Sequence, residues 1–162
     1  MNLSAFKAYD IRGDYPSAVN EDLAKAVGRA FVRYLSAKNI VVGMDMRQSS
    51  LSLHKALIEG INCEGSDVFD IGFCSTPMLS SSVVRYGYDG GIMISASHSP
   101  GNENGLKLID ATGNQIGEGF GLENIKLIIE KGFGECLGAG AVIKKSVLVD
   151  YLEGLIPLID SI

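Results

Sequence analysis

The chain has 162 residues, of which 46% are hydrophobic and 20% are charged, and its formal net charge is −5. This composition is ordinary for a globular protein, and a chain of this length buries about 70% of its unfolded surface, which is enough for one independent core. The negative charge argues against a nucleic-acid partner. No apolar stretch is long enough to span a bilayer and the N-terminus carries no secretory signal, so we expect no membrane partner and a cytoplasmic location.

The first half of the chain alternates strand and helix patterns. Apolar runs next to turn residues predict strands at residues 5–13, 39–43 and 67–72. Apolar residues at helical spacing predict helices at residues 21–35 and 50–64. Asn20 is a suitable N-cap for the first helix, and Ser49 or Ser50 can cap the second. His54 falls within the second helix, and we expect it on the helix surface.

The second half continues the alternation. A helix opens at Ser75-Thr76-Pro77, where Pro77 suits the first helical position, and it ends near Gly87. The pattern then predicts a buried strand up to Ser95 and a second strand at residues 106–109. A polar turn follows the second strand, which indicates a β-hairpin.

The C-terminal part is less regular. Apolar spacing predicts a helix at residues 119–129, and the glycine content of residues 131–141 indicates a surface loop. We expect a last helix that is capped by Ser146 and stopped by Pro157. Strands alternating with helices indicate the α/β class, as a three-layer α/β/α sandwich. The hairpin makes its sheet mixed and mostly parallel.

The cysteines give no sign of a metal site or a disulfide framework. Cys63, Cys74 and Cys136 are odd in number and widely spaced, and only His54 and His98 could add imidazole ligands. Structural zinc is therefore not expected. We predict reduced thiols, which suits a cytoplasmic protein.

The segment with the clearest chemical potential follows the strand that ends at Ser95. Ser97 and His98 stand there in a shaped loop at the end of a buried strand. An acyl-transfer triad does not fit, because no Gly-x-Ser-x-Gly elbow is present and a histidine adjacent in the chain rarely has nucleophile–base geometry. Phosphoryl transfer fits better, since it depends on positioning and on cations around the moving group. Arg12 and Lys107 are the cations at hand, with His98 as a candidate proton carrier.

Three motifs carry a resemblance to a known family. Residues 95–100, Ser-Ala-Ser-His-Ser-Pro, resemble the Thr-Ala-Ser-His-Asn-Pro phosphoserine loop of the α-D-phosphohexomutases, the phosphomannomutase/phosphoglucomutase family. Residues 8–13 match the Ala-Tyr-Asp-Ile-Arg-Gly signature that opens phosphomannomutases, and residues 104–107 resemble the Asn-Gly-aromatic/aliphatic-Lys segment. Ser95 and Ser99 depart from the usual Thr and Asn, and Met44 replaces the first Arg of a Gly-Arg-Asp-x-Arg turn.

The resemblance implies a reaction and a cofactor. Ser97, as phosphoserine, would pass its phosphoryl group to mannose or glucose 6-phosphate, forming a hexose 1,6-bisphosphate that returns the other phosphoryl group and leaves the 1-phosphate. The glucosamine phosphate mutases fit less well, because their opening pattern differs. Mg²⁺ would be bound through the phosphate on Ser97, with its remaining ligands in an Asp-rich loop absent from this chain.

The resemblance also assigns roles to individual residues. Lys107 and His98 would lie beside the reacting hydroxyl, and Arg12 beside the phosphoserine. The residues expected to bind substrate or phosphate are Tyr9, Arg47 and Asn104.

The resemblance covers nearly the whole chain but only the first of the family's four domains. We therefore assign residues 1–156 to domain I, which carries the phosphoserine loop, and residues 157–162 to a C-terminal end leading to missing domains. A hexose phosphate and the remaining domains of the same polypeptide are the expected partners, and the chain alone is expected to be inactive. The alternative is a non-catalytic phosphate-binding or interaction module derived from this domain.

Overall fold

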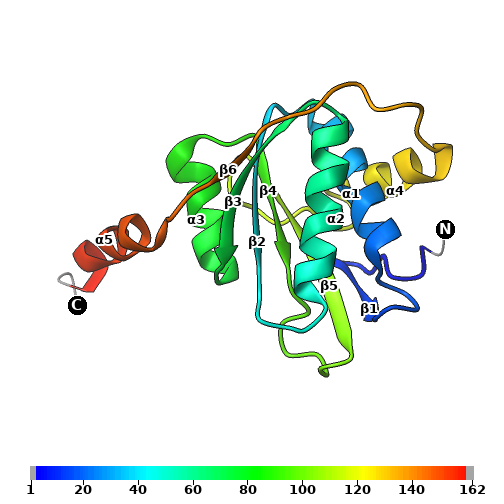
Figure 1. Ribbon diagram of the computed structural model, residues 1–162. Coiled ribbons are helices and arrows are strands. Elements are labelled where there is room, and N and C mark those ends of the chain that lie inside the picture. Colours follow the sequence, from blue (N-terminus) through cyan, green and yellow to red (C-terminus); the bar gives the residue numbers. More distant parts are fainter. Residues whose placement is uncertain (1–2, 160–162) are drawn as a thin grey trace.

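The structure is a computed structural model of the chain, and it describes residues 3–159. One mixed sheet of six strands, in the order β1-β5-β4-β2-β3-β6, has helices on both faces (Figure 1). The predicted three-layer α/β/α sandwich with a mostly parallel sheet is confirmed. The strands are β1 (Ile11–Asp14), β2 (Asn39–Met44), β3 (Asp67–Phe73), β4 (Gly90–Ile94), β5 (Glu103–Asp110) and β6 (Val142–Lys144). The helices are α1 (Glu21–Leu35), α2 (Ser50–Cys63), α3 (Thr76–Tyr86), α4 (Leu122–Lys131) and α5 (Leu148–Ile159).

The helices divide between the two faces of the sheet. Helices α1, α2 and α4 supply the apolar side chains of the larger core cluster, whereas α3 packs on the opposite face with a smaller one. Helix α5 contacts α3 and extends away from the sheet (Figure 1). Gly28 lets α1 and α2 pack closely, because a Cβ atom there would lie 2.6 Å from the carbonyl oxygen of Leu57.

Local sequence signals explain most helix boundaries. The side chain of Asn20 accepts a hydrogen bond from the backbone N–H of Leu23 (2.9 Å), as expected of an N-cap. Ser75 caps α3 in the same way, with Pro77 in the first turn, and Gly87 ends α3 with φ 66°. A glycine accepts this left-handed conformation without a steric penalty.

The strand order brings two loops together. Strands β4 and β2 are parallel neighbours, with Met44 paired to Ile94, so the segments that follow them leave the same end of the sheet. Strand β5 runs antiparallel to β4 and begins at that end. It starts at Glu103, earlier than predicted, and the predicted hairpin beyond it is a tight turn with one bridge between Ile109 and Gln115.

The C-terminal helix continues where the sequence predicted a stop. Pro157 lies inside α5. A proline removes one helical hydrogen bond and crowds the preceding turn, but it supplies a helical φ, and on this exposed helix water can satisfy the freed carbonyl. Because α5 crosses position 156, the assignment of residues 1–156 and 157–162 to separate segments stays a prediction; residues 160–162 lie outside the described part.

His54 is not on the surface, so that prediction was wrong. His54 is 5% exposed, and its Nε2 lies 2.9 Å from Oδ1 of Asp70 on β3. The buried face of α2, which includes Leu53 and Leu57, lies against the sheet, and His54 is turned toward that side. The carboxylate of Asp70 satisfies the ring nitrogen there, which is what a buried imidazole requires.

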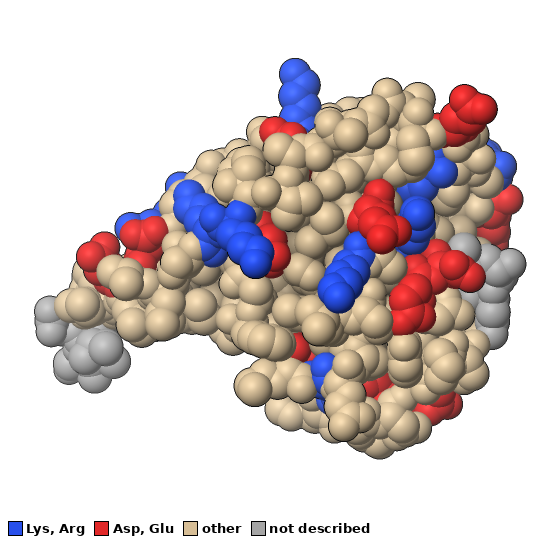
Figure 2. All heavy atoms as spheres, viewed as in Figure 1, with Lys and Arg blue, Asp and Glu red and all other residues tan. Residues whose placement is uncertain are grey.

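Charged side chains of both signs are interspersed over the face seen in Figure 2, so the net negative charge is not gathered into one field on that face. Among the described residues, no helix is long and apolar enough to cross a membrane.

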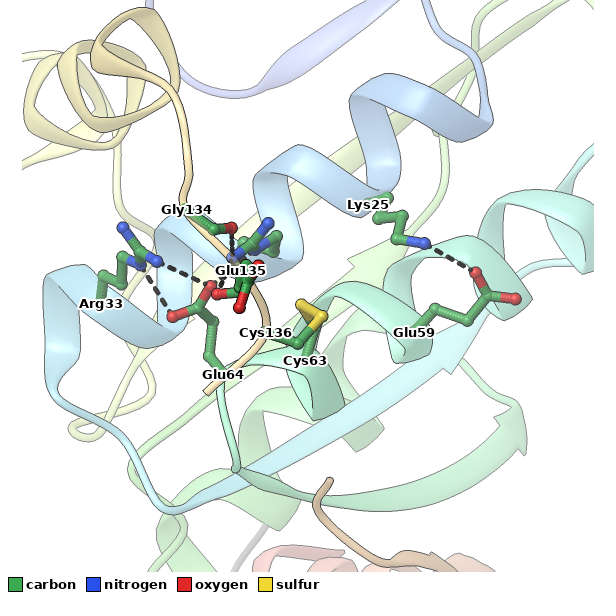
Figure 3. Close-up of a disulfide and its surroundings, with 9 residues drawn as sticks. Lys25, Arg33, Glu59, Cys63, Glu64, Gly134, Glu135 and Cys136 are labelled. Atoms are coloured by element: carbon green, nitrogen blue, oxygen red, sulfur yellow. Dashed lines mark hydrogen bonds and ion pairs between the residues drawn. A yellow bond between two sulfur atoms is a disulfide. The ribbon is translucent and has the colours of Figure 1, made fainter. Parts of the chain in front are cut away.

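A disulfide joins Cys63, at the end of α2, to Cys136 (Figure 3). The prediction of reduced thiols is therefore wrong for this pair, while Cys74 is free. The two cysteines are 73 residues apart in the chain, and only the fold makes them neighbours. Their spacing gave no signal because disulfide pairing depends on the distance between Cα atoms, which is 4.7 Å here.

The disulfide is one of several contacts that anchor the segment between α4 and β6, residues 132–141, which we name the strap. The backbone N–H of Leu137 donates to the carbonyl of Cys63 (2.8 Å), and Arg29 donates to the carbonyls of Gly134 and Glu135. The strap is exposed, as predicted, but it is held in place and leads into β6, a strand that the sequence pattern did not predict.

Candidate active site

The loop that follows β4 presents Ser97 to solvent. The backbone N–H of Ser97 donates to Oγ of the buried Ser95 (2.9 Å), and Ser97 has φ 54°. A residue with a Cβ atom pays a steric penalty in this left-handed region, so the surrounding contacts must hold it there. Both Ser97 and His98 are exposed. The loop therefore holds a free hydroxyl group outward in a defined backbone conformation.

Arg47, which follows β2, holds the backbone of this loop. Its guanidinium uses five N–H donors, the full number that an arginine has. The acceptors are the carbonyls of Ser97 (3.0 Å), Ser99 (2.7 Å), Pro100 (2.6 Å) and Glu103 (3.0 Å) and the carboxylate of Asp45 (3.2 Å). In this arrangement Arg47 positions the loop, and its predicted role in binding substrate or phosphate stays a prediction.

Asn104 holds the start of β5 against the start of α2. Its side chain is fully buried, and Nδ2 donates to Oγ of Ser49 (2.8 Å) and of Ser50 (3.0 Å). Ser50 in turn donates to Oδ1 of Asp45 (2.6 Å). These contacts connect the start of β5 and the segment after β2 through the start of α2. The predicted role of Asn104 in binding substrate or phosphate stays a prediction.

Two cations share one carboxylate beside the loop. Lys107 Nζ donates to Oδ2 of Asp10 (2.9 Å), and Arg12 donates to the same oxygen (2.5 Å). Arg12 also reaches the loop, with Nη1 3.4 Å from Oγ of Ser99. The structure thus brings the predicted cations Arg12 and Lys107 together and joins Arg12 to the loop that carries Ser97.

The other predicted residues are less constrained. Tyr9 is 78% exposed, next to Asp10 in the chain. His98 is exposed and makes no hydrogen bond to any residue between 3 and 159 that the structure describes. Their predicted roles, in substrate binding and in proton transfer, stay predictions.

Residues 3–133 match the family model described as phosphoglucomutase/phosphomannomutase, alpha/beta/alpha domain I. The chain belongs to the phosphoglucomutase/phosphomannomutase family. A phosphomannomutase of Escherichia coli is 40% identical over 161 residues, which are 98% of this chain and 35% of that protein. A phosphomannomutase of Klebsiella pneumoniae is 43% identical over 129 residues, which are 80% of this chain and 82% of that sequence.

A solved relative has the same fold. A crystal structure of a phosphoglucomutase/phosphomannomutase family protein from Burkholderia thailandensis superposes with a TM-score of 0.82 at 30% identity. The match covers 97% of this chain and 36% of that one. The chain thus spans about a third of the length of the Escherichia coli and Burkholderia relatives.

The donor groups near Ser97 do not by themselves fit the Mg²⁺ that the resemblance implies. No group of three or more His, Cys, Asp or Glu side chains among the described residues is arranged to hold a metal. The nearby carboxylate of Asp10 is engaged by two cations. Mg²⁺ needs several oxygen ligands, and the described residues of this phosphoglucomutase/phosphomannomutase domain set no such group beside Ser97, so its role as a metal ligand stays a prediction.

Two residues of the site were not predicted, Asp10 and Ser95. Asp10 stands within the Ala-Tyr-Asp-Ile-Arg-Gly motif of the family, so the signal was present, but nothing local identified Lys107 as its partner. Ser95 was noted only as a departure from the usual Thr, and its hydroxyl accepts the hydrogen bond that orders Ser97.

Proposed function

We propose that this domain carries the phosphoryl group of a phosphohexomutase on Ser97. The phosphoserine would transfer its group to mannose or glucose 6-phosphate, and the hexose 1,6-bisphosphate so formed would return the other phosphoryl group, leaving the 1-phosphate. Membership of the phosphoglucomutase/phosphomannomutase family supports this reaction class, and the relatives named phosphomannomutase favour mannose.

The observation that carries the proposal is the state of Ser97. It is exposed and adopts a left-handed conformation, and its carbonyl is held by Arg47. Strained residues that their surroundings hold in place are typical of functional sites. A loop held in this way supports in-line transfer, which depends on the position of the donor more than on covalent chemistry by the protein.

The transfer step exchanges one phosphorus–oxygen bond for another. The bond between phosphorus and Oγ of Ser97 breaks while a bond from phosphorus to the sugar hydroxyl oxygen forms. The proton of that hydroxyl leaves to a base and Oγ gains a proton, and Lys107 and His98 are the groups proposed for these transfers. Arg12 would offset negative charge on the phosphoryl oxygens. Bound Mg²⁺ would supply further charge neutralisation, with most of its ligands coming from outside the described residues.

Phosphorylation of Ser97 tests the proposal directly. The chain is incubated with a hexose 1,6-bisphosphate and Mg²⁺, and the site of any added phosphate is mapped by peptide mass spectrometry. We expect one phosphoryl group on Ser97, its loss in Ser97→Ala, and its retention in Ser99→Ala. Phosphate on another residue, or none, would overturn the proposal. Reversible binding of phosphate without covalent transfer would favour the alternative, a non-catalytic phosphate-binding module.

A further inference from the structure

The carboxylate of Asp10 is buried between Arg12 and Lys107. Asp10 is 5% exposed and Lys107 9% exposed, and a single oxygen, Oδ2, accepts from both cations. Carboxylates of this degree of burial are rarely found unless they are paired. The pairing leaves one positive charge in excess beside the serine loop.

The sheet register explains why the three side chains meet. Ile11 pairs with Leu106 and Arg12 with Gly105. Asp10 directly precedes β1 and Lys107 directly follows Leu106, so the pairing brings Asp10 within hydrogen-bond reach of Lys107. Side chains two residues apart on a strand share a face, so Asp10 and Arg12 point the same way. Leu106 packs in the larger core, which puts its neighbour Lys107 on the opposite face of the sheet.

The backbone alone does not place the two cationic groups. A lysine ammonium stands on a flexible four-carbon stem, and an arginine has a similarly mobile side chain. Arg12 spans the distance between Asp10 and Ser99, and among the described residues its buried Nε has no hydrogen-bond partner. The carboxylate of Asp10 thus fixes the positions of the Arg12 guanidinium and the Lys107 ammonium group.

We propose that Asp10 is a positioning residue for chemistry at Ser97, acting as the internal counter-anion of Arg12 and Lys107. Without a phosphate in the site, Asp10 holds both cations in place, and an arriving phosphate shares them with it. This inference rests on the proposed function. Asp10 lowers the affinity of the site for free phosphate, because its charge opposes the anion, and it raises the rate of transfer, because it fixes the cations.

Opposite effects on binding and transfer form the test. In Asp10→Asn the shape of the side chain is kept and its charge is lost. We expect inorganic phosphate to bind about tenfold more tightly, as measured by calorimetry on the 162-residue chain, because one opposing charge close to the anion is removed. Phosphorylation of Ser97 by hexose 1,6-bisphosphate should slow by about tenfold, since the cations lose their fixed position.

Asp14→Asn is the matched control. Asp14 ends β1, four residues after Asp10, is exposed, and accepts a hydrogen bond from Asn102. Its substitution removes the same charge from the chain and should change phosphate affinity and transfer less than about twofold, because exposed charges are screened. Equal effects of Asp10→Asn and Asp14→Asn, or weaker phosphate binding by a folded Asp10→Asn protein, would overturn the proposal.

Asp10→Glu provides a second route if Asp10→Asn does not fold. It keeps the charge and moves the carboxylate by one methylene group, so we expect phosphate affinity within about twofold and transfer that is about tenfold slower. Unchanged transfer in Asp10→Glu would show that the position of this carboxylate does not matter. Failure of the proposed function itself has a different readout, namely no phosphate on Ser97 in the unsubstituted chain.

Discussion

At the scale of single residues, the site depends on Ser97, which is exposed, and on Arg47, which holds the loop around it. Ser97 must leave its hydroxyl free while its backbone is held in a conformation that non-glycine residues avoid. Arg47 uses four N–H donors of its guanidinium on backbone carbonyls between Ser97 and Glu103, and the fifth on the carboxylate of Asp45. The first residue is placed for chemistry, and the second makes that placement possible.

Two substitutions of Ser97 separate its chemical role from its strain. Ser97→Ala and Ser97→Gly should both abolish phosphorylation, because each removes the hydroxyl group. The free energy of unfolding should be about 1 kcal/mol higher for the glycine variant than for the alanine variant, because glycine has no Cβ atom that clashes with the backbone at positive φ. Urea denaturation of both variants measures this difference, and equal stabilities would contradict a strained Ser97.

Arg47→Lys tests the role of the arginine in the loop. A lysine keeps the charge but offers fewer donors from a single nitrogen, so several loop carbonyls lose their partner. We expect the free energy of unfolding to fall by about 2 kcal/mol and phosphorylation of Ser97 to slow by about tenfold or more. Arg85 is exposed and donates to one backbone carbonyl, that of Asp150 (2.9 Å), so Arg85→Lys should cost less than about 1 kcal/mol. Similar effects at the two positions would exclude a specific role for Arg47.

At the scale of elements, the strap is held to the helix pair α1–α2 by a disulfide, hydrogen bonds and cation–π contacts. Glu64, at the end of α2, accepts from Arg33 (2.7 Å) and Arg29 (2.6 Å), and both guanidinium groups lie over the ring of Phe133. The disulfide between Cys63 and Cys136 closes the same region (Figure 3). These contacts lead the chain to the sheet edge where β6 forms.

Breaking the disulfide should loosen the strap without disturbing the serine loop. A native disulfide typically stabilises a protein by about 2–4 kcal/mol. The unsubstituted chain should therefore lose about that much unfolding free energy on reduction, whereas a chain with Cys63→Ser and Cys136→Ser should show no response to reductant. Urea denaturation with and without dithiothreitol measures both, and identical curves for the unsubstituted chain would contradict a stabilising disulfide.

Glu64 should make stability sensitive to acid. Burial alone would raise the pKa of Glu64, but hydrogen bonds from Arg33 and Arg29 lower it below the ordinary value of 4.5. A carboxylate with a lowered pKa stabilises the fold fully above 4.5, and this contribution disappears as pH falls through the lowered pKa. The difference in Tm between the unsubstituted chain and Glu64→Gln should shrink below pH 4.5. For Glu59→Gln, at an exposed ion pair with Lys25, we expect little pH dependence; the same dependence in both would contradict the assignment to Glu64.

At the scale of the whole molecule, two core clusters support a site that remains open to solvent. Both faces of the sheet are covered, and the larger cluster alone contains side chains from α1, α2, α4 and five strands. The reactive loop nevertheless lies in the open, with Ser97 and His98 exposed. Water at such a site weakens electrostatic stabilisation and favours hydrolysis over transfer.

We therefore expect this chain to fold alone and to show no mutase turnover. Its thermal unfolding, followed by circular dichroism, should be cooperative. A coupled assay of mannose 6-phosphate and mannose 1-phosphate interconversion, with Mg²⁺ and hexose 1,6-bisphosphate supplied, should give no turnover. One phosphorylation of Ser97 needs a single encounter with the bisphosphate, whereas turnover needs the bisphosphate to stay bound and to reorient. Among the described residues, no group of three or more His, Cys, Asp or Glu side chains is arranged to hold the Mg²⁺ that would keep it bound. Turnover comparable to that of the Escherichia coli phosphomannomutase would show that the site is complete within this domain.

The sequence by itself determined most of the helices and strands, and the family. Helical and strand periodicity, the Asn20 and Ser75 caps and the glycine at position 87 are local signals, and they act through neighbouring residues whatever the rest of the fold does. The motifs around Arg12 and Ser97 likewise indicated the phosphohexomutase family before any contact was known, because a family signature is a property of the chain.

Only the tertiary structure decided which side chains meet. Asp10 and Lys107 are 97 residues apart in the chain, Cys63 and Cys136 are 73 apart, and His54 and Asp70 are 16 apart. Arg47 binds the carbonyl of Ser97, 50 residues away, and no sequence pattern marks a backbone carbonyl as a partner. The pairing of Ile11 with Leu106 brings the neighbouring residues Asp10 and Lys107 together, and the path of the strap places Cys136 beside Cys63. A contact of this kind depends on how distant segments pack, whereas periodicity reports only the nearest turn or strand face.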